Sequence, residues 1–326
     1  MKEFIERPRF SCALGGALIT LTSLPEVIPI VHAAMGCAGN LNNAIAFGAG
    51  YYGDGYCGGG HIPTSSITET EIVFGGVEKL QTEISNTLKL IDGQLYVVLT
   101  GCMTEIIGDD AQAVAKTFFD DGAPVMAVNT PSFSGHSYTG YELALSGIFN
   151  DYFVESKEKK KKLVNLFGLV PGYNPFFRGD LAEIARLIKS LGFSVNTFFT
   201  PDQDFENLIS APQAQLNILL SPVWGLDLVK QFEKKHGTPY WATNLPIGAA
   251  ATDLFLEELG NRLKVSSKKI KELIDQENNE YYGYFIRTAD VFSDSDYKYY
   301  AATVTDSTYA IPMTFFLHEE LGWIAS

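Results

Sequence analysis

Short runs of β-branched and aliphatic residues alternate with longer amphipathic stretches along this chain, and the alternation restricts the folds that it can adopt. In the first half, the apolar runs 27–31, 96–99 and 125–128 are typical of strands that are buried on both faces. Between them, residues 76–90 and 109–119 carry apolar side chains at spacings of three and four, which predicts helices. Strands and helices that alternate in this way form parallel sheets covered on both faces. We therefore predict an α/β fold with tandem, doubly wound, Rossmann-like domains.

The pattern restarts after the one strong charge run, residues 155–162, which reads Glu-Ser-Lys-Glu-Lys-Lys-Lys-Lys. Such a run is typical of a solvated linker and predicts a domain boundary. The segments that predict a second α/β unit beyond it are strands at 163–170, 194–199 and 216–220 and helices at 178–191, 226–235 and 249–263.

A long polar helix at 267–282 then leads to one more strand, 299–304, and one more helix, 309–321. A lone strand and helix cannot bury their own apolar faces. They must pack on the second sheet or belong to a longer protein, and we favour the longer protein. The predicted domains are residues 1–158, residues 163–265, and residues 266–326 as a connecting helix and the start of a truncated third domain.

Composition excludes several classes of protein. A chain of 326 residues exceeds what one hydrophobic core usually supports, and 46% hydrophobic with 19% charged residues is typical of a globular protein. The net charge of −14 argues against a nucleic-acid partner, since such binding depends on Lys and Arg. The charged N-terminus lacks the apolar core of a signal peptide, and no apolar run reaches membrane-spanning length. We expect a cytoplasmic protein with no membrane partner.

Cys12, Cys37 and Cys102 lie where we expect a strand to give way to a helix or a glycine turn. Strand ends in a parallel sheet meet at one edge, so these three thiols can converge. Helix N-termini and glycine turns offer backbone N–H groups that stabilise thiolates. Two interpretations stay open: a buried iron–sulfur cluster, or three buried structural thiols. Disulfides are disfavoured, because such frameworks belong to small secreted chains.

Read together, five segments resemble nitrogenase component 1, in particular its β-type subunit. They are Cys12-Ala-Leu-Gly-Gly-Ala, Val31-His-Ala-Ala-Met-Gly-Cys-Ala, Ser66-Ile-Thr-Glu-Thr-Glu-Ile-Val-Phe-Gly-Gly, Thr100-Gly-Cys-Met-Thr-Glu-Ile-Ile-Gly-Asp-Asp and Asn129-Thr-Pro-Ser-Phe-Ser-Gly. A weaker likeness continues through Leu169-Val-Pro-Gly-Tyr and Asn244-Leu-Pro-Ile-Gly. The resemblance implies subunits built from three α/β domains, so the last strand and helix would begin the third.

By this resemblance, Cys12, Cys37 and Cys102 match three thiolates that hold a cluster at the subunit interface. The implied cofactor is a P-cluster-like 8Fe-7S cluster or a 4Fe-4S cluster. A partner subunit would complete it, either an α-type chain or a second copy of this chain. The family takes electrons from an ATP-dependent iron protein and passes them to a site that reduces dinitrogen, a tetrapyrrole or another substrate.

The expected function is therefore that of a nitrogenase-like oxidoreductase subunit that relays electrons through the interface cluster. The chain has no cysteine after residue 102, so it cannot supply the thiolate with which the family's α-type subunit holds its catalytic metal cofactor. The alternative is a non-catalytic scaffold for metallocluster or nitrogenase cofactor assembly. Both functions use the same three cysteines.

Other residues of the motifs have mainly structural interpretations. Thr68 or Glu69 is expected to cap or charge the start of the helix that follows the Phe74-Gly-Gly turn, and Glu69 is also a candidate for partner docking. Thr104 is expected to cap the following helix and to hold the cysteine loop. The acidic turn 108–110 is a candidate docking surface, and His32 is expected to be a hydrogen-bonded polar residue at a strand end.

Two further groups are weak candidates. Cys57 and His61 lie four residues apart in a glycine-rich loop that departs from the family pattern, and without a second pair they are poor evidence for a metal site. Phe176, Phe177 and Trp224 are candidates to line an apolar substrate cavity, although core packing is the simpler interpretation.

Overall fold

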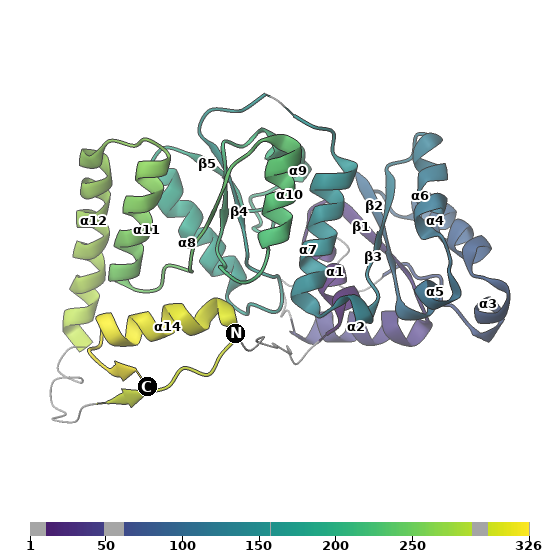
Figure 1. The fold of residues 1–326 in the computed structure, drawn as a ribbon, viewed down its shortest axis with the longest axis horizontal. Helices are drawn as coiled ribbons and strands as arrows, with labels where there is room; N and C mark the ends of the chain where they lie inside the picture. The colour runs from purple at the N-terminus through teal and green to yellow at the C-terminus, as the bar shows by residue number, and fades with distance from the viewer. Residues whose placement is uncertain (1–10, 49–61, 157, 289–298, 326) are drawn as a thin grey trace.

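The computed structural model describes residues 11–48, 62–156, 158–288 and 299–325. Two parallel sheets lie side by side along the molecule with helices packed on their faces, and a smaller C-terminal segment lies at one end (Figure 1). The predicted α/β fold with tandem parallel sheets is confirmed.

The first sheet contains β1 (Val27–His32), β2 (Leu95–Thr100) and β3 (Val125–Asn129), in that order and all parallel. Every residue of β1 and β2 is buried, as expected of strands covered on both faces. The predicted strands are therefore correct to within one residue at each end.

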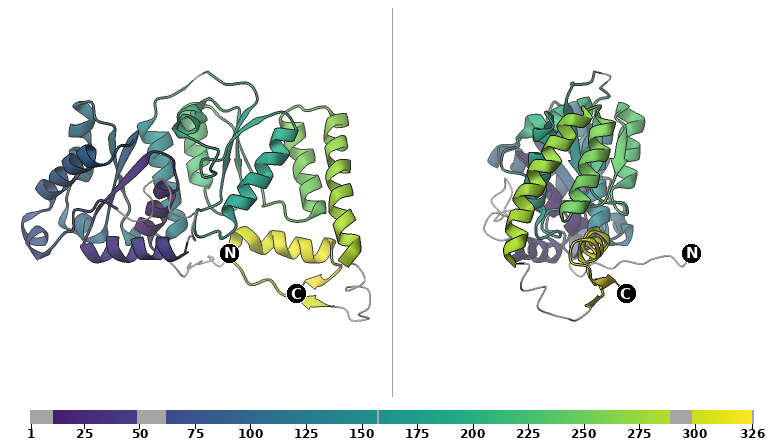
Figure 2. Two further views of the ribbon diagram at one scale, coloured as in Figure 1. Left: turned by 180° about the vertical axis from the view of Figure 1, so that it is seen from behind. Right: turned by 90° about the vertical axis from the view of Figure 1, so that its left-hand side faces the viewer.

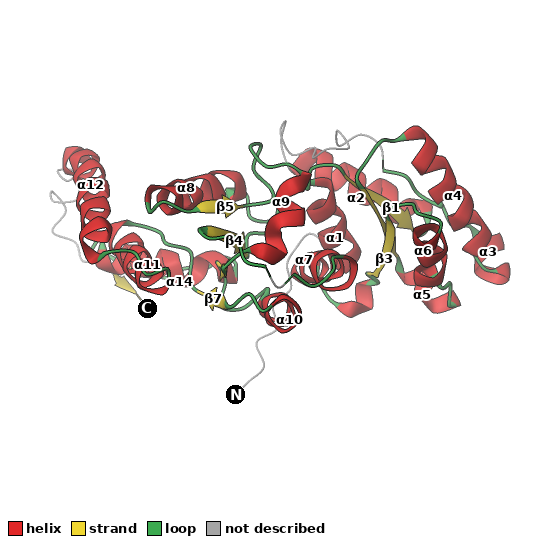
Figure 3. Cartoon of the chain, turned by 90° about the horizontal axis from the view of Figure 1, so that it is seen from above, coloured by secondary structure: helices red, strands yellow, loops and turns green. Residues whose placement is uncertain are grey.

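Alternate side chains of these strands enter two separate cores. Ile28 and Ile30 pack with α4 (Val77–Leu90) and α6 (Ala111–Asp120) on one face. On the other face, neighbouring side chains of the same strands pack with α1 (Ala13–Thr22) and α7 (Ser137–Ser146). Figure 3, seen from above, shows these two helix layers on either side of the sheet.

Helix α1 was not predicted, because all ten of its residues are buried and it shows no helical periodicity. Glycines let it lie directly against α7. A Cβ atom at Gly16 would come within 1.9 Å of the Ser137 carbonyl oxygen, and one at Gly140 within 2.0 Å of the Ala13 carbonyl oxygen. The Gly-Gly of the first motif thus permits backbone contact between two helices.

The second sheet contains β4 (Leu163–Phe167), β5 (Ser194–Asn196), β6 (Leu216–Leu219) and β7 (Tyr240–Ala242), parallel and in the order β5-β4-β6-β7. The first of these strands is shorter than predicted because Gly168, at φ 108°, turns the chain away from the sheet. The helices of this unit are α8 (Phe177–Ser190), α9 (Phe205–Ser210), α10 (Leu226–His236) and α11 (Ala249–Arg262). The strand β7 was not predicted, since it has only three residues.

Both sheets share one continuous hydrophobic core. Phe149, in the π-helical segment η2 (Gly147–Tyr152) that follows α7, packs against Phe167 and Phe232 of the second unit with ring centroids 5.8 and 5.6 Å away. The predicted linker between the units is also anchored. The Lys159 ammonium group donates hydrogen bonds to the carbonyl oxygens of Pro212 (2.8 Å) and His236 (2.7 Å).

The C-terminal segment consists of α12 (Ser267–Phe285), the 3-10 turn η4 (Ile286–Thr288), β8 (Tyr300–Ala301), α14 (Ser307–Glu319) and β9 (Ile324–Ala325). Strands β8 and β9 pair in parallel as a separate small sheet, while α12 and α14 both pack against α11. Figure 2 shows these helices at the end of the molecule away from the first sheet. The strand predicted at 299–304 is therefore much shorter than expected, and the proposed domain boundaries stay a prediction.

The remaining described elements surround the carboxyl edge of the first sheet or link helices. They are α2 (Met35–Gly48), α3 (Glu69–Phe74), α5 (Cys102–Ile107), η1 (Ser132–Ser134) and η3 (Ala211–Gln213). Within the described part of the chain, no helix combines the length and the apolar character that crossing a bilayer requires.

Candidate metal centre

The three candidate cysteines all lie at the start of helices. Cys12 is the N-cap residue of α1, Cys37 is the third residue of α2, and Cys102 is the first residue of α5. Helices α2 and α5 follow the carboxyl ends of β1 and β2, so the predicted strand-to-helix position is confirmed for Cys37 and Cys102. Cys12 instead forms a single antiparallel bridge with His136, and the residues before position 11 lie outside the described chain.

Cys102 is partly buried and contacts the short helix η1. Its Sγ atom lies 2.8 Å from the Ser132 hydroxyl oxygen, and the Ser132 backbone N–H donates to Sγ at 3.1 Å. These two contacts fix the direction of the Cys102 sulfur. Ser132 belongs to the fifth sequence motif, but the sequence alone did not single it out.

Cys12 reaches the same segment from the other side. The N–H of Ala13, the next residue, donates to the Gly135 carbonyl oxygen at 3.1 Å, and Cys12 itself bridges to His136. Residues 132–136 therefore lie against both Cys12 and Cys102, although these cysteines are far apart in sequence.

Cys37 lies close enough to the other two cysteines for them to affect its pKa. Although this residue reaches solvent, partial burial raises the pKa of its thiol, and the neighbouring Cys102 and Cys12 raise it further. Like charges shift a pKa only when they lie close to one another. The structure thus brings all three cysteines into one neighbourhood at the carboxyl edge of the first sheet, along the lower side of Figure 1 near α2 and α5.

Thiolates are the usual ligands of iron–sulfur clusters, and this set consists of three thiols. Among the described residues, no three His, Cys, Asp or Glu side chains converge closely enough to hold one metal ion. An iron–sulfur cluster takes its thiolates on separate iron atoms, so its ligands are spaced more widely. The three thiols fit such a group, with Cys37 open on the outer side.

Thr104 holds the Cys102 loop, as predicted. Its fully buried hydroxyl lies 2.9 Å from the His32 carbonyl oxygen and 3.0 Å from the Gly101 carbonyl oxygen. The Gly101 N–H lies 3.2 Å from the same hydroxyl oxygen. This contact fixes the start of α5 against the end of β1.

The expected role of residues 68–69 at the start of the helix after the Phe74-Gly-Gly turn is wrong: that helix is α4, whose N-cap residue is Gly76, and residues 68–69 instead begin the separate short helix α3. Thr68 is the N-cap residue of α3, and its N–H donates to the Glu71 carboxylate at 2.7 Å. Hydrogen bonds from Thr68, aided by Lys79, lower the pKa of Glu71 to about 2. Glu69 is exposed in the first turn of the helix, and its docking role stays a prediction.

The acidic turn is exposed at Gly108 and Asp110 but not at the Asp109 side chain, and its docking role stays a prediction. The Asp109 side chain is only 4% exposed and points inward, where its carboxylate accepts hydrogen bonds from the Gly76 N–H at 2.9 and 3.0 Å. Asp110 is exposed, but it serves as the N-cap of α6 by accepting from the Ala113 N–H at 2.9 Å. Local hydrogen bonding therefore accounts for both carboxylates.

His32 is a hydrogen-bonded residue at the end of β1, as predicted. Its ring is completely buried, with Nδ1 2.8 Å from the Ser65 hydroxyl and Nε2 3.1 Å from the Asp109 carboxylate. Burial lowers the pKa of His32, while the nearby carboxylates of Asp109 and Glu105 oppose this change. No observation makes it a metal ligand.

The weak candidates have mixed outcomes. Cys57 and His61 lie outside the described residues. Phe177 is buried in the core, and Trp224 stacks on Tyr138 with ring centroids 5.1 Å apart. Phe176 is 67% exposed and lines an open pocket of about 540 Å³ together with residues of the C-terminal segment.

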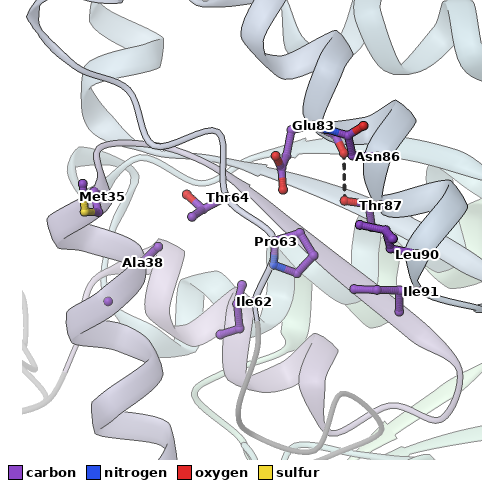
Figure 4. A pocket seen from close by; sticks show the side chains of 11 residues that line it. Met35, Ala38, Ile62, Pro63, Thr64, Glu83, Asn86, Thr87, Leu90 and Ile91 are labelled. Carbon is purple, nitrogen blue, oxygen red and sulfur yellow. Dashed lines mark hydrogen bonds between the residues drawn. The ribbon is translucent and has the colours of Figure 1, made fainter.

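A second pocket, of about 420 Å³, lies beside Cys37 between α2 and α4 (Figure 4). Met35 and Ala38 line it from the cysteine-bearing helix, and Glu83 and Leu90 from the opposite helix. Burial raises the pKa of Glu83, and a hydrogen bond from the Thr64 backbone opposes the shift. The sequence did not indicate this pocket, because Glu83 reads as an ordinary polar residue of an amphipathic helix.

This chain is similar to nitrogenase proteins and to proteins of nitrogenase cofactor biosynthesis. Residues 12–325 match the family of nitrogenase component 1 type oxidoreductases. The chain is 27% identical over 88% of its length to the nitrogenase molybdenum–iron protein beta chain of Bradyrhizobium diazoefficiens. It is 29% identical over 70% of its length to the nitrogenase iron–molybdenum cofactor biosynthesis protein NifE of Nostoc.

The fold has a close counterpart among solved structures. The structure of nitrogenase Cp1 at pH 6.5 superposes with a TM-score of 0.74 at 23% identity, covering 99% of this chain and 62% of that one. This chain spans 57% of the length of the Bradyrhizobium beta chain and 46% of the Nostoc protein. Since the family match covers almost all of its residues, the chain belongs to the nitrogenase component 1 type oxidoreductases.

Proposed function

We propose that this chain is a β-type subunit of a nitrogenase-like reductase, in which Cys12, Cys37 and Cys102 hold an iron–sulfur cluster at a subunit interface. The cluster would accept electrons from an ATP-dependent iron protein and pass them to a substrate-reducing site. The main observation behind this proposal is that the three cysteines lie close together. The thiols of Cys102 and Cys12 raise the pKa of Cys37, and residues 132–136 contact both Cys12 and Cys102.

The surrounding residues would prepare the thiols to bind iron. When bound, the cluster supplies a low-potential store for electrons. The Ser132 N–H donates to Cys102 Sγ and would hold this sulfur in place for iron. The raised pKa of Cys37 means that this thiol keeps its proton when free, so iron binding must release it.

A partner subunit should complete the site. Cluster iron atoms are commonly held by about four thiolates, and this chain offers three in its described part. The exposure of Cys37 supports an open side of the site at the surface, where an α-type chain or a second copy of this chain would supply the missing ligands. We place the complex in the cytoplasm.

The iron protein would dock on the apolar surface formed by Val73 and Phe74 at the end of α3 and Ile106 on α5. These side chains are 71%, 84% and 69% exposed. Helices α3 and α5 pack together, and α5 begins at Cys102. Clustered exposed apolar side chains are typical of protein interaction sites.

ATP-dependent electron acceptance tests the proposal. The chain would be produced without oxygen together with its partner subunit and mixed with the iron protein encoded beside it. We expect reduction of the cluster that requires both the iron protein and MgATP, followed by oxidation when a substrate is added. Cluster-containing protein that accepts no electrons from the iron protein under these conditions would contradict a relay function.

Assembly of a metallocluster is the second candidate function. It is favoured by the similarity to cofactor biosynthesis proteins, which match 70 to 83% of this chain at 26 to 29% identity. A scaffold should release its cluster to an acceptor protein, whereas a relay subunit should retain it through repeated turnover. Iron measured in both proteins after mixing and separation distinguishes these outcomes.

A further inference from the structure

The buried pair His32 and Asp109 connects the surface turn between α3 and α4 with the loops that carry two of the cysteines. The first link is at the turn. Both carboxylate oxygens of Asp109 accept hydrogen bonds from the Gly76 N–H, at 2.9 and 3.0 Å. Gly76 follows Phe74 and Gly75, so the exposed end of α3 lies two residues away.

The second link joins Asp109 to the end of β1. The Asp109 Oδ2 atom lies 3.1 Å from His32 Nε2, and the Ser65 hydroxyl holds the other ring nitrogen at 2.8 Å. The His32 ring is completely buried and the Asp109 side chain is 4% exposed, so water does not compete for this contact.

The third link is made by the backbone of His32. Its carbonyl oxygen accepts from the Gly101 N–H at 2.9 Å and from the Thr104 hydroxyl at 2.9 Å, and these two residues flank Cys102. His32 also ends the strand that leads into the helix carrying Cys37. Asp109 therefore contacts the α3–α4 turn and the His32 ring, while the His32 backbone contacts the Cys102 loop and ends the strand before Cys37.

Packing leaves this connection little freedom. A Cβ atom at Gly76 would come within 2.6 Å of the Asp109 carboxylate and 3.2 Å of the His32 ring. A displacement of the turn must therefore move the Asp109–His32 pair or break its hydrogen bonds. Tightly packed groups of this kind transmit displacement between sites.

We propose that His32 and Asp109 are positioning residues that couple contact at the α3 surface to the geometry of the cluster ligands Cys37 and Cys102. The inference rests on the proposed function, since it assigns the iron protein to the α3 surface. Docking there would set the rate at which the cluster accepts an electron, while the pair itself touches neither the iron protein nor the cluster.

The test uses Asp109→Ala in the complete complex, with three measurements: iron content, reduction by dithionite, and reduction by the iron protein with MgATP. We expect iron content and dithionite reduction to stay at the wild-type level. The iron-protein-dependent kcat should fall about fivefold or more, a common size for coupling between two sites, while the KM for the iron protein changes little. Asp92→Ala, an exposed carboxylate at the opposite edge of the sheet, should match the wild type.

Asp109→Asn is the second variant, because it keeps the side-chain volume and one acceptor oxygen. Its kcat should lie between those of Asp109→Ala and the wild type. Two results overturn the proposal: an unchanged kcat in both variants, or a parallel loss of iron, of dithionite reduction and of folding in both, which would make the pair purely structural. A wild-type complex that fails in the same assay would contradict the proposed function instead.

Discussion

At the scale of single residues, two members of the sequence motifs, His32 and Asp109, have buried side chains that form a hydrogen bond to each other. His32 has a lowered pKa because burial disfavours its charged form, although Asp109 and Glu105 favour it. The unfolded chain then binds this proton more readily than the folded chain. The contribution of His32 to stability is therefore complete above its unfolded pKa of about 6.5 and declines as the pH falls below it.

We expect His32→Gln to lose stability relative to the wild type at pH 7.5 and to lose less of it at pH 5. Urea unfolding of both proteins across this pH range measures the difference. His318→Gln removes an imidazole from an exposed position and serves as the control. A wild-type protein that gains stability relative to His32→Gln as the pH falls would show that His32 becomes charged in the folded state.

Phe74 provides a second prediction at this scale. It is 84% exposed, so replacing it changes little in the folded chain but removes apolar area from the docking surface. Phe74→Ala should raise the KM for the iron protein about tenfold, which corresponds to ~1.4 kcal/mol of binding energy. Leu254→Ala, at a 58% exposed position on α11, should leave this KM unchanged. Equal KM values for both variants would place the docking surface elsewhere.

At the scale of elements, the contact between α1 and α7 positions Cys12. Helix α1 begins just after this cysteine, and Gly140 of α7 lies against the Ala13 carbonyl oxygen, 2.0 Å from where a Cβ atom would be. Two helices can approach this closely only where side chains are missing. The contact therefore fixes the cysteine relative to residues 132–136.

Gly140→Ala should destabilise the protein by about 1 to 3 kcal/mol, the usual cost of overpacking. Gly283→Ala is the matched control, because its Cβ atom would meet nothing within 4 Å in the exposed helix α12. It should be neutral or stabilising by up to about 1 kcal/mol, as expected from helix propensity. Chemical unfolding measures both effects, and a fully stable Gly140→Ala would contradict the close contact.

Helices with a clear apolar period and buried β-branched strands were predictable from the sequence, and the fully buried helix α1 was not. The helix at 77–90 shows its apolar face as a repeat, so its position was found closely. Helix α1 is buried all round, and its small and aliphatic residues carry no period. The positions of Cys37 and Cys102 followed from their place after strands, but Ser132 could not be found, because its contact with Cys102 spans 30 residues. The same applies to the inward direction of Asp109, which depends on Gly76 and His32.

At the scale of the whole molecule, the cysteine-bearing unit and the second unit share one core, so the site does not lie on an independent domain. The contacts of Phe149, which follows α7, with Phe167 and Phe232 of the second unit show how closely the two units pack. The C-terminal segment packs against α11 of the second unit, and the start of α14 also reaches the first unit, where the Tyr138 hydroxyl donates to the Asp306 carboxylate at 2.6 Å. Under the proposed function, electrons would enter at the first unit, and the substrate would be reduced at an interface with a partner.

We propose that the three cysteines hold one cluster. Analysis of bound metal is the direct test of this proposal. The chain would be purified without oxygen with its partner, and iron, acid-labile sulfide and the EPR spectrum of the dithionite-reduced protein would be measured for the wild type, Cys102→Ala and Cys57→Ala. We predict iron and sulfide in the wild type, a strong loss in Cys102→Ala because an iron site is left open, and retention in Cys57→Ala. Folded, partner-bound wild type without iron, or Cys102→Ala with unchanged iron, would contradict the account.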